Sequence, residues 1–83
     1  MSRQQQITWI TRYFFANKMT SLTASDFEFE RKFIASTGHE LSHNLWRERI
    51  RSAAKEAGLI GVRVYNSCAD PAAGIPIYST VYS

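Results

Sequence analysis

Hydrophobic residues recur along this chain of 83 residues with helical spacing in three segments and with alternating spacing in two. The first helical segment spans residues 7–17, where Ile7, Ile10 and Phe14 fall on one side of a helix. The second spans residues 26–36 and the third spans residues 43–57. The alternating segments, 62–65 and 77–82, are typical of half-buried β-strands. The pattern therefore predicts three helices followed by two strands.

Local signals mark the two ends of the second predicted helix. Ser25 and Glu28 match the S-x-x-E capping box, in which each side chain accepts a hydrogen bond from a free backbone N–H group. Gly38 predicts a left-handed residue at the C-terminal end. The buried side of this helix is predicted to carry Phe27, Phe33 and Ile34. The preceding residues 18–23 are too few for a helix and predict a loop or a short strand.

The third predicted helix has the clearest periodicity. Its hydrophobic positions repeat at 3.6 residues per turn and form one stripe, made of Trp46, Ile50, Ala53, Ala54 and Ala57. Ser42 is a suitable N-cap, Lys55 suits the last turn, and Gly58 suits the position after the helix. These signals predict a helix that packs one side on a core and leaves the other side in solvent.

The remaining segments complete one small α+β domain. Residues 66–74 contain Asn, Asp-Pro and Gly, which turns require, so the two strands are expected to form a hairpin. A chain of 83 residues has room for a single core. We predict a disordered N-terminal arm at residues 1–6 and one domain at residues 7–83.

Composition and charge exclude several classes of protein. A hydrophobic content of 45% with 20% charged residues excludes a disordered chain. The single cysteine, Cys68, cannot form an intrachain disulfide, and neither a signal peptide nor a membrane span is present, so we expect a cytoplasmic protein without membrane contact. The net charge of +3 favours a polyanionic partner.

The order of the predicted elements resembles a winged helix-turn-helix domain. Residues 22–27 open the second helix, residues 46–60 form the third helix with its Ala-Gly-Leu-Ile end, and residues 77–78 lie in the returning strand. The resemblance implies a three-helix α+β fold with a C-terminal β-hairpin wing and with the third helix in the major groove of DNA. The stretch 34–45 is longer than the tight turn usual in that family.

The solvent side of the third helix carries side chains that can contact DNA. At about 100° per residue, the positions opposite or beside the apolar stripe are Asn44, Arg47, Glu48, Arg51, Ser52 and Lys55. Asn can pair with adenine, Arg with guanine and Glu with cytosine, whereas Lys55 and Arg63 of the hairpin suit phosphate oxygens. The same charges can equally serve to keep an amphipathic helix solvated.

A second motif points to different chemistry. His39, Glu40 and His43 form an H-E-x-x-H sequence, the pattern in which two histidines one helical turn apart bind zinc. It resembles the zincin metallopeptidase signature and makes His39 and His43 candidate ligands of a zinc hydrolase or a structural metal site. However, Gly38 and Ser42 predict a helix end and a helix start, so the two histidines are expected to flank a turn.

These observations favour a non-catalytic protein that binds duplex DNA and needs no cofactor, either a transcription regulator or an accessory factor in replication or recombination. The alternative is a winged-helix-like interaction or inhibitor protein that does not bind DNA, of the kind that a phage or mobile element could encode. The zinc hydrolase is a third hypothesis. We further expect the C-terminal strand to lie at the edge of its sheet, where it could pair with a second copy or a partner protein.

Overall fold

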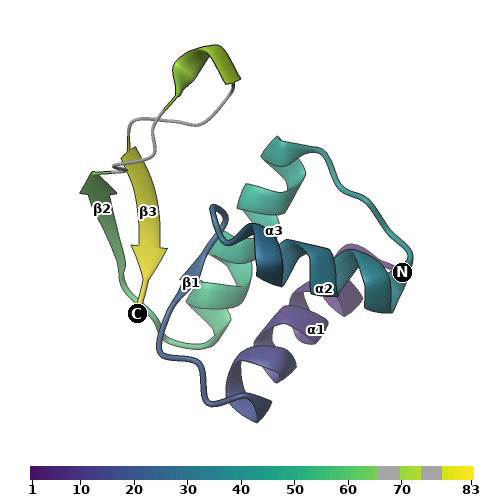
Figure 1. The fold of residues 1–83 in the computed structure, drawn as a ribbon. Helices are drawn as coiled ribbons and strands as arrows, with labels where there is room; N and C mark the ends of the chain where they lie inside the picture. The colour runs from purple at the N-terminus through teal and green to yellow at the C-terminus, as the bar shows by residue number, and fades with distance from the viewer. Residues whose placement is uncertain (66–69, 74–77) are drawn as a thin grey trace.

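The computed structural model describes residues 1–65, 70–73 and 78–83, and within them three α-helices pack beside a three-stranded antiparallel sheet (Figure 1). In chain order the elements are α1 (Arg3–Ala16), β1 (Leu22–Thr23), α2 (Phe27–Thr37), α3 (His43–Glu56), β2 (Gly61–Tyr65), the short 3₁₀ helix η1 (Pro71–Ala73) and β3 (Tyr78–Tyr82). The α+β class and the C-terminal hairpin are confirmed, and the arrangement is compatible with a winged helix-turn-helix.

Helix α1 begins four residues earlier than its hydrophobic pattern predicts, so the expectation of a disordered arm at residues 1–6 is wrong. Ser2 is the N-cap of α1. Its backbone N–H donates to Gln5 Oε1 at 2.8 Å, and the Gln5 N–H donates to Ser2 Oγ at 3.2 Å. This reciprocal capping box satisfies two N–H groups of the first turn and stabilises a polar helix start that no apolar residue marks.

Helix α2 is capped by Asp26, one residue after the predicted Ser25. The Asp26 carboxylate accepts a hydrogen bond from the backbone N–H of Phe29 at 3.1 Å. The Ser25 hydroxyl instead shares a hydrogen bond of 2.7 Å with the hydroxyl of Ser79 in β3. A contact between segments 54 residues apart therefore displaces the predicted local cap.

The core is aromatic and lies where the three helices meet. Phe29 and Phe33, one turn apart on α2, pack on Trp46 of α3 with ring centroids 5.8 and 5.1 Å away. Phe33 also meets Trp9 of α1 edge-on at 5.2 Å. Phe27, predicted to be buried, is 52% exposed, because the helix turns positions 29 and 33 inward instead.

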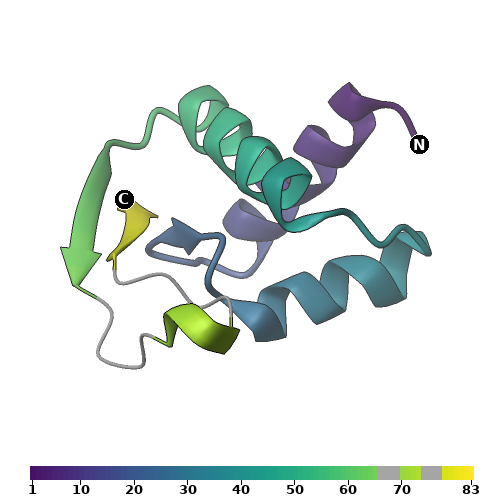
Figure 2. The same cartoon turned by 90° about the horizontal axis from the view of Figure 1, so that it is seen from above.

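The predicted ends of α2 and α3 are confirmed by their backbone geometry. Gly38 follows α2 with φ of 71°, a left-handed conformation that glycine adopts without steric cost. The Ser42 hydroxyl caps α3 by accepting from the N–H of Leu45 at 3.3 Å, and Gly58 follows α3 with φ of 76°. Figure 2 shows the resulting layout, with the hairpin at one end of the helical layer.

The sheet has the order β1-β3-β2, so the C-terminal strand is central and not at an edge as expected. β3 pairs with β2 in a register that joins Gly61 to Tyr82, and with β1 in a register that joins Leu22 to Tyr82. The short segment 22–23 is the strand that covers the other side of β3. Leu22 is buried and Tyr82 packs partly against the core, so this row faces the helices.

Close packing at Gly61 leads to a stability prediction. A methyl group on Gly61 would lie 2.8 Å from Cε1 of Tyr82 and 3.1 Å from Cγ2 of Thr80. Tyr82 is held against the core, so we expect Gly61→Ala to lower the free energy of unfolding by about 1–3 kcal/mol. Urea denaturation measures this, and a variant at least as stable as the wild type would contradict the packing described for this position.

Candidate nucleic-acid interface

Helix α3 has one buried side and one exposed side. Trp46, Ile50, Ala53 and Ala54 are buried against the other helices and β1, as the stripe predicts. Four of the six predicted DNA-binding residues on α3 are exposed, namely Asn44, Arg47, Arg51 and Lys55. Because Arg47, Arg51 and Lys55 are spaced by four residues, they follow one another along a single ridge of the helix. We call these four residues the α3 ridge.

The neighbouring side of α3 faces α1 through a polar network. The Arg3 guanidinium forms a salt bridge with Glu48 and donates to Ser52 Oγ at 2.9 Å. Arg49 forms a second salt bridge with Glu48 and donates from Nε to Gln6 Oε1 at 2.7 Å. The network fixes the position of α3 against α1.

The second carboxylate of α3 is also turned toward α1. Glu56 accepts a hydrogen bond from Nε2 of Gln4 at 3.1 Å. Together with the salt bridges of Glu48, this contact places both acidic groups of α3 on the α1 side. The α3 ridge is left with cationic and neutral polar side chains only.

The network lowers the pKa of its central carboxyl group, Glu48. The hydrogen bond from Arg3, followed by those from Arg49 and Ser52, lowers the pKa of Glu48 from 4.5 to about 2, although partial burial acts in the opposite direction. The same hydrogen bond raises the pKa of Arg3. The ionised form of Glu48 is therefore favoured in the folded protein.

A pH-dependent stability follows from the sign of this shift. A carboxyl whose pKa is lowered by folding stabilises the fold above its unfolded pKa of about 4.5, and this contribution is lost as the pH falls from there toward about 2. We expect Glu48→Gln to be less stable than the wild type at pH 7 and the difference to shrink steadily below pH 4.5. Thermal melts at several pH values measure this. A difference that stays constant down to pH 2 would count against the network.

Glu48 and Ser52 are predicted from the sequence to contact DNA, but in the structure both side chains accept hydrogen bonds from Arg3. We therefore assign them to the contact between α1 and α3. Sequence reasoning missed Arg3 because it assigned residues 1–6 to a disordered arm. The S-x-x-Q spacing of Ser2 and Gln5 is the signal that could have extended α1 to include it.

The cations of the α3 ridge form no salt bridge with a described residue. Within residues 1–65, 70–73 and 78–83, salt bridges join Glu48 to Arg3 and to Arg49, and none involves Arg47, Arg51 or Lys55. An exposed cation without a carboxylate partner is available to an anionic ligand. The packing of α3 thus separates its charges, with acids toward α1 and bases toward solvent.

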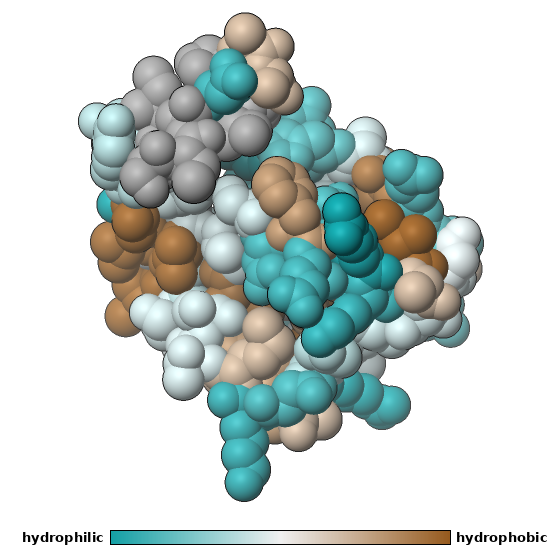
Figure 3. All heavy atoms as spheres, in the orientation of Figure 1, coloured by the Kyte–Doolittle hydropathy of each residue, from teal (hydrophilic) through white to brown (hydrophobic). Residues whose placement is uncertain are grey.

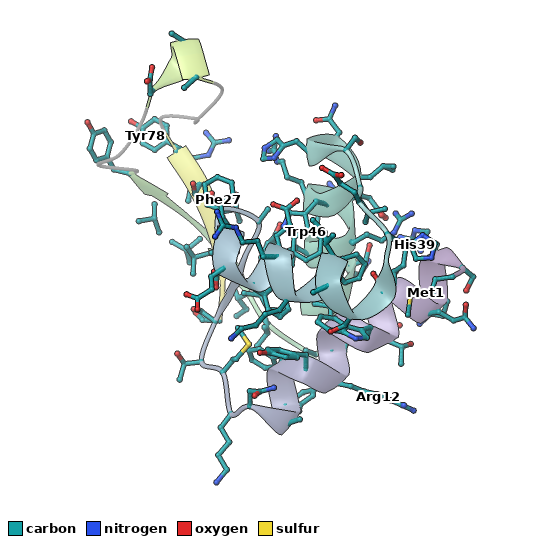
Figure 4. All side chains as sticks on the ribbon, turned by 45° about the vertical axis from the view of Figure 1, so that its right-hand side comes forward. Met1, Arg12, Phe27, His39, Trp46 and Tyr78 are labelled. Carbon is teal, nitrogen blue, oxygen red and sulfur yellow. The ribbon has the colours of Figure 1, made fainter. Side chains whose placement is uncertain are left out.

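The hairpin adds a fifth predicted residue, Arg63, from β2. Side chains alternate across a strand, so Arg63 and Tyr65 project from the same sheet face as Gly61 and Tyr82, which is the face that carries the helices. The guanidinium carbon of Arg63 lies 6.0 Å from the ring centroid of Tyr78, and Tyr65 meets that ring edge-on at 6.1 Å. Figure 4 shows Tyr78 on the hairpin, beyond the helices.

The H-E-x-x-H residues do not share a helix. α2 ends at Thr37 and α3 begins at His43, so His39 lies in the connection, with its Nε2 atom 3.3 Å from the N-terminal amine of Met1. Figure 4 shows His39 beside Met1, at the opposite end of the molecule from Tyr78. The zinc peptidase motif needs both histidines on one helical face, and this geometry is absent.

The described part of the chain offers no other metal-ligand cluster. Within it, no group of three His, Cys, Asp or Glu side chains is placed to share an ion. Cys68 lies outside the described residues. The described helices also include none with the length and apolar character needed to cross a bilayer.

Comparison with known proteins adds no relative on which to base a function. No protein-family model matches the chain, and no curated protein or solved structure shows a significant match to it. The α3 ridge and the hairpin beside it are accordingly the observations from which a function can be argued.

Proposed function

We propose that this protein binds double-stranded DNA without catalysing a reaction. The α3 ridge enters the major groove, and the β2–β3 hairpin contacts an adjacent stretch of backbone as a wing. The observation that carries this proposal is the separation of charge on α3, which leaves Arg47, Arg51 and Lys55 exposed and without an acidic partner among the described residues.

The chemistry of the ridge suits the major groove. That groove is wide enough to admit an α-helix, and each base pair presents a distinct set of donors and acceptors there. Asn44 can make two hydrogen bonds to adenine, and Arg47 and Arg51 can each make two to guanine. Lys55, at the C-terminal end of the ridge, suits a phosphate oxygen, as does Arg63 of the hairpin. A regulator of transcription or an accessory factor in replication or recombination would use such a surface.

The dimensions of the domain are consistent with one binding site on one turn of DNA. The described chain measures 32 × 26 × 19 Å. One helical turn of duplex DNA is about 34 Å long. A single copy would therefore cover about one half-site.

Titration of a labelled duplex tests the proposal directly. A duplex of random sequence, about two helical turns long, is titrated with the protein at low salt, and fluorescence anisotropy reports binding. We expect saturable binding in the micromolar range or tighter, and weaker binding to the single strand, which has no major groove. Absence of binding at about 100 µM protein would instead support the interaction protein that does not bind DNA.

A further inference from the structure

Strand β2 has an open edge. The strand order places β2 on the outside of the sheet, next to β3 only. Ile60 and Ser83, adjacent to the two strands, exchange backbone hydrogen bonds of 2.9 and 3.0 Å. Hydrogen-bonded positions alternate along an antiparallel pair, so the N–H and C=O groups of Gly61, Arg63 and Tyr65 point away from β3. No strand of the described chain pairs with these groups.

The open edge is largely apolar. All five residues of β2 are exposed, its one charged residue is Arg63, and the segment carries no lysine or proline, two residues that commonly block pairing at sheet edges. Ile60, Val62 and Val64 are 73%, 56% and 45% exposed. Figure 3 shows hydrophobic side chains gathered at this side of the molecule, over β2. An extended strand added to this edge would satisfy its backbone groups and cover its valines.

The sequence of β2 is complementary to itself in one register. Antiparallel pairing of two β2 strands must join residues whose backbone groups face outward, which are Gly61, Arg63 and Tyr65. Pairing Arg63 with Arg63 opposes two like charges, and pairing Arg63 with Gly61 offers the side chain no partner. Pairing Arg63 with Tyr65 places a guanidinium beside an aromatic ring twice, once on each side of the two-fold axis.

We propose that two copies of this chain dimerise through β2, with Arg63 of each copy opposite Tyr65 of the other. The two pairs form four backbone hydrogen bonds and extend the sheet to six strands. Val64 then meets the second copy's Val64 on the two-fold axis, at a position where antiparallel side chains are closest. Arg63 lies between the Tyr78 ring of its own chain and the Tyr65 ring of the other.

This interface goes beyond the proposed DNA contact and does not depend on it. The two-fold axis of such a dimer is perpendicular to the sheet, so both α3 helices lie on the same side of the six-stranded sheet. The interface uses no residue of the α3 ridge, but it shares Arg63 with the proposed wing contact. Association is therefore measured by sedimentation without DNA, and the part of the α3 ridge in DNA binding is measured with Arg47→Ala/Arg51→Ala, which lies outside the interface, so that failure of one proposal is distinguished from failure of the other.

A pair of substitutions at Arg63 tests the role of the backbone edge. Arg63→Pro removes the outward N–H group and leaves the bonds to β3 in place, because proline is tolerated in edge strands where its nitrogen faces solvent. Arg63→Ala removes the same side chain and keeps the N–H group. By sedimentation velocity at about 10 to 300 µM, we expect the wild type to reach twice the 9.5 kDa of one chain, Arg63→Ala to dimerise more weakly because it loses the contact with Tyr65 but keeps the backbone bonds, and Arg63→Pro to remain monomeric.

A second substitution tests the register and remains informative if Arg63→Pro does not fold. Val64→Lys places two ammonium groups on the two-fold axis, and we expect it to raise the dimer dissociation constant by more than about tenfold, whereas Val64→Ile leaves the dimer intact. Circular dichroism shows whether each variant is folded. A wild-type protein that stays monomeric at 300 µM, or a Val64→Lys variant that dimerises like the wild type, overturns the proposal.

Discussion

Replacement of Trp46 by alanine is expected to unfold most of the protein. Trp46 is fully buried and its ring packs against both Phe29 and Phe33, so truncation leaves a cavity at the point where the three helices meet. Such substitutions cost about 3–5 kcal/mol. A domain of this size has roughly 5 kcal/mol of stability in total. Near-ultraviolet circular dichroism and urea denaturation measure the loss.

Two further variants make this test specific. The indole Nε1 atom of Trp46 is buried and has no hydrogen-bond partner among the described residues, so Trp46→Phe should cost far less than Trp46→Ala. Phe27 is 52% exposed, and Phe27→Ala should change the free energy of unfolding by no more than about 0.5 kcal/mol. Equal losses for Phe27→Ala and Trp46→Ala would instead support the core predicted from the sequence, with Phe27 inside.

Removal of two cations from the α3 ridge is expected to abolish most of the affinity for duplex DNA. Arg47→Ala/Arg51→Ala deletes two side chains that are exposed and without salt bridges within the described chain. Each contact of this kind is worth about 1–3 kcal/mol, so the dissociation constant should rise about 30-fold or more. Because neither side chain packs in the core, the melting temperature should change little.

A matched control distinguishes the effect of the α3 ridge on DNA affinity from the effect of the total positive charge. Arg12→Ala/Lys18→Asn also removes two positive charges, but Figure 4 shows Arg12 pointing away from the hairpin, and Lys18 follows the C-terminal end of α1. Asparagine tolerates the positive φ of 52° at position 18. We expect this control to weaken binding by no more than about threefold. Similar losses in both double variants would mean that α3 has no special part in binding.

Much of the fold could be predicted because the signals concerned are local. The N-cap at Ser42, the left-handed glycines at positions 38 and 58, and the stripe around Trp46 each depend on neighbours within a few residues. The hairpin could be predicted from two segments of alternating hydrophobicity and a connection rich in turn-forming residues. Residues 66–69 and 74 of that connection lie outside the described part of the chain. The exposed positions of the α3 ridge follow from the same periodicity.

The features that could not be predicted depend on contacts between distant segments. The Ser25 hydroxyl forms a hydrogen bond with Ser79 and does not cap α2. The strand at 22–23 pairs with β3 and makes the C-terminal strand central in the sheet. Arg3 bonds to Glu48, which lies 45 residues away in sequence. Glu48, a candidate base contact from its sequence position, therefore forms an intramolecular salt bridge in the fold. A helical wheel assigns Glu48 and Ser52 to the solvent side because it contains no information about where α1 packs.

The salt dependence of duplex binding tests the central claim most directly. On a duplex of random sequence, Arg47 and Arg51 are expected to contact phosphates in place of guanine. If these two, Lys55 and Arg63 each displace a counterion, a plot of log affinity against log salt should have a slope of about −3.6. The slope should become shallower by about 2 in Arg47→Ala/Arg51→Ala and stay unchanged in Arg12→Ala/Lys18→Asn. A wild-type slope near zero, or the same slope in both double variants, would contradict the assignment of the α3 ridge as the DNA-binding surface.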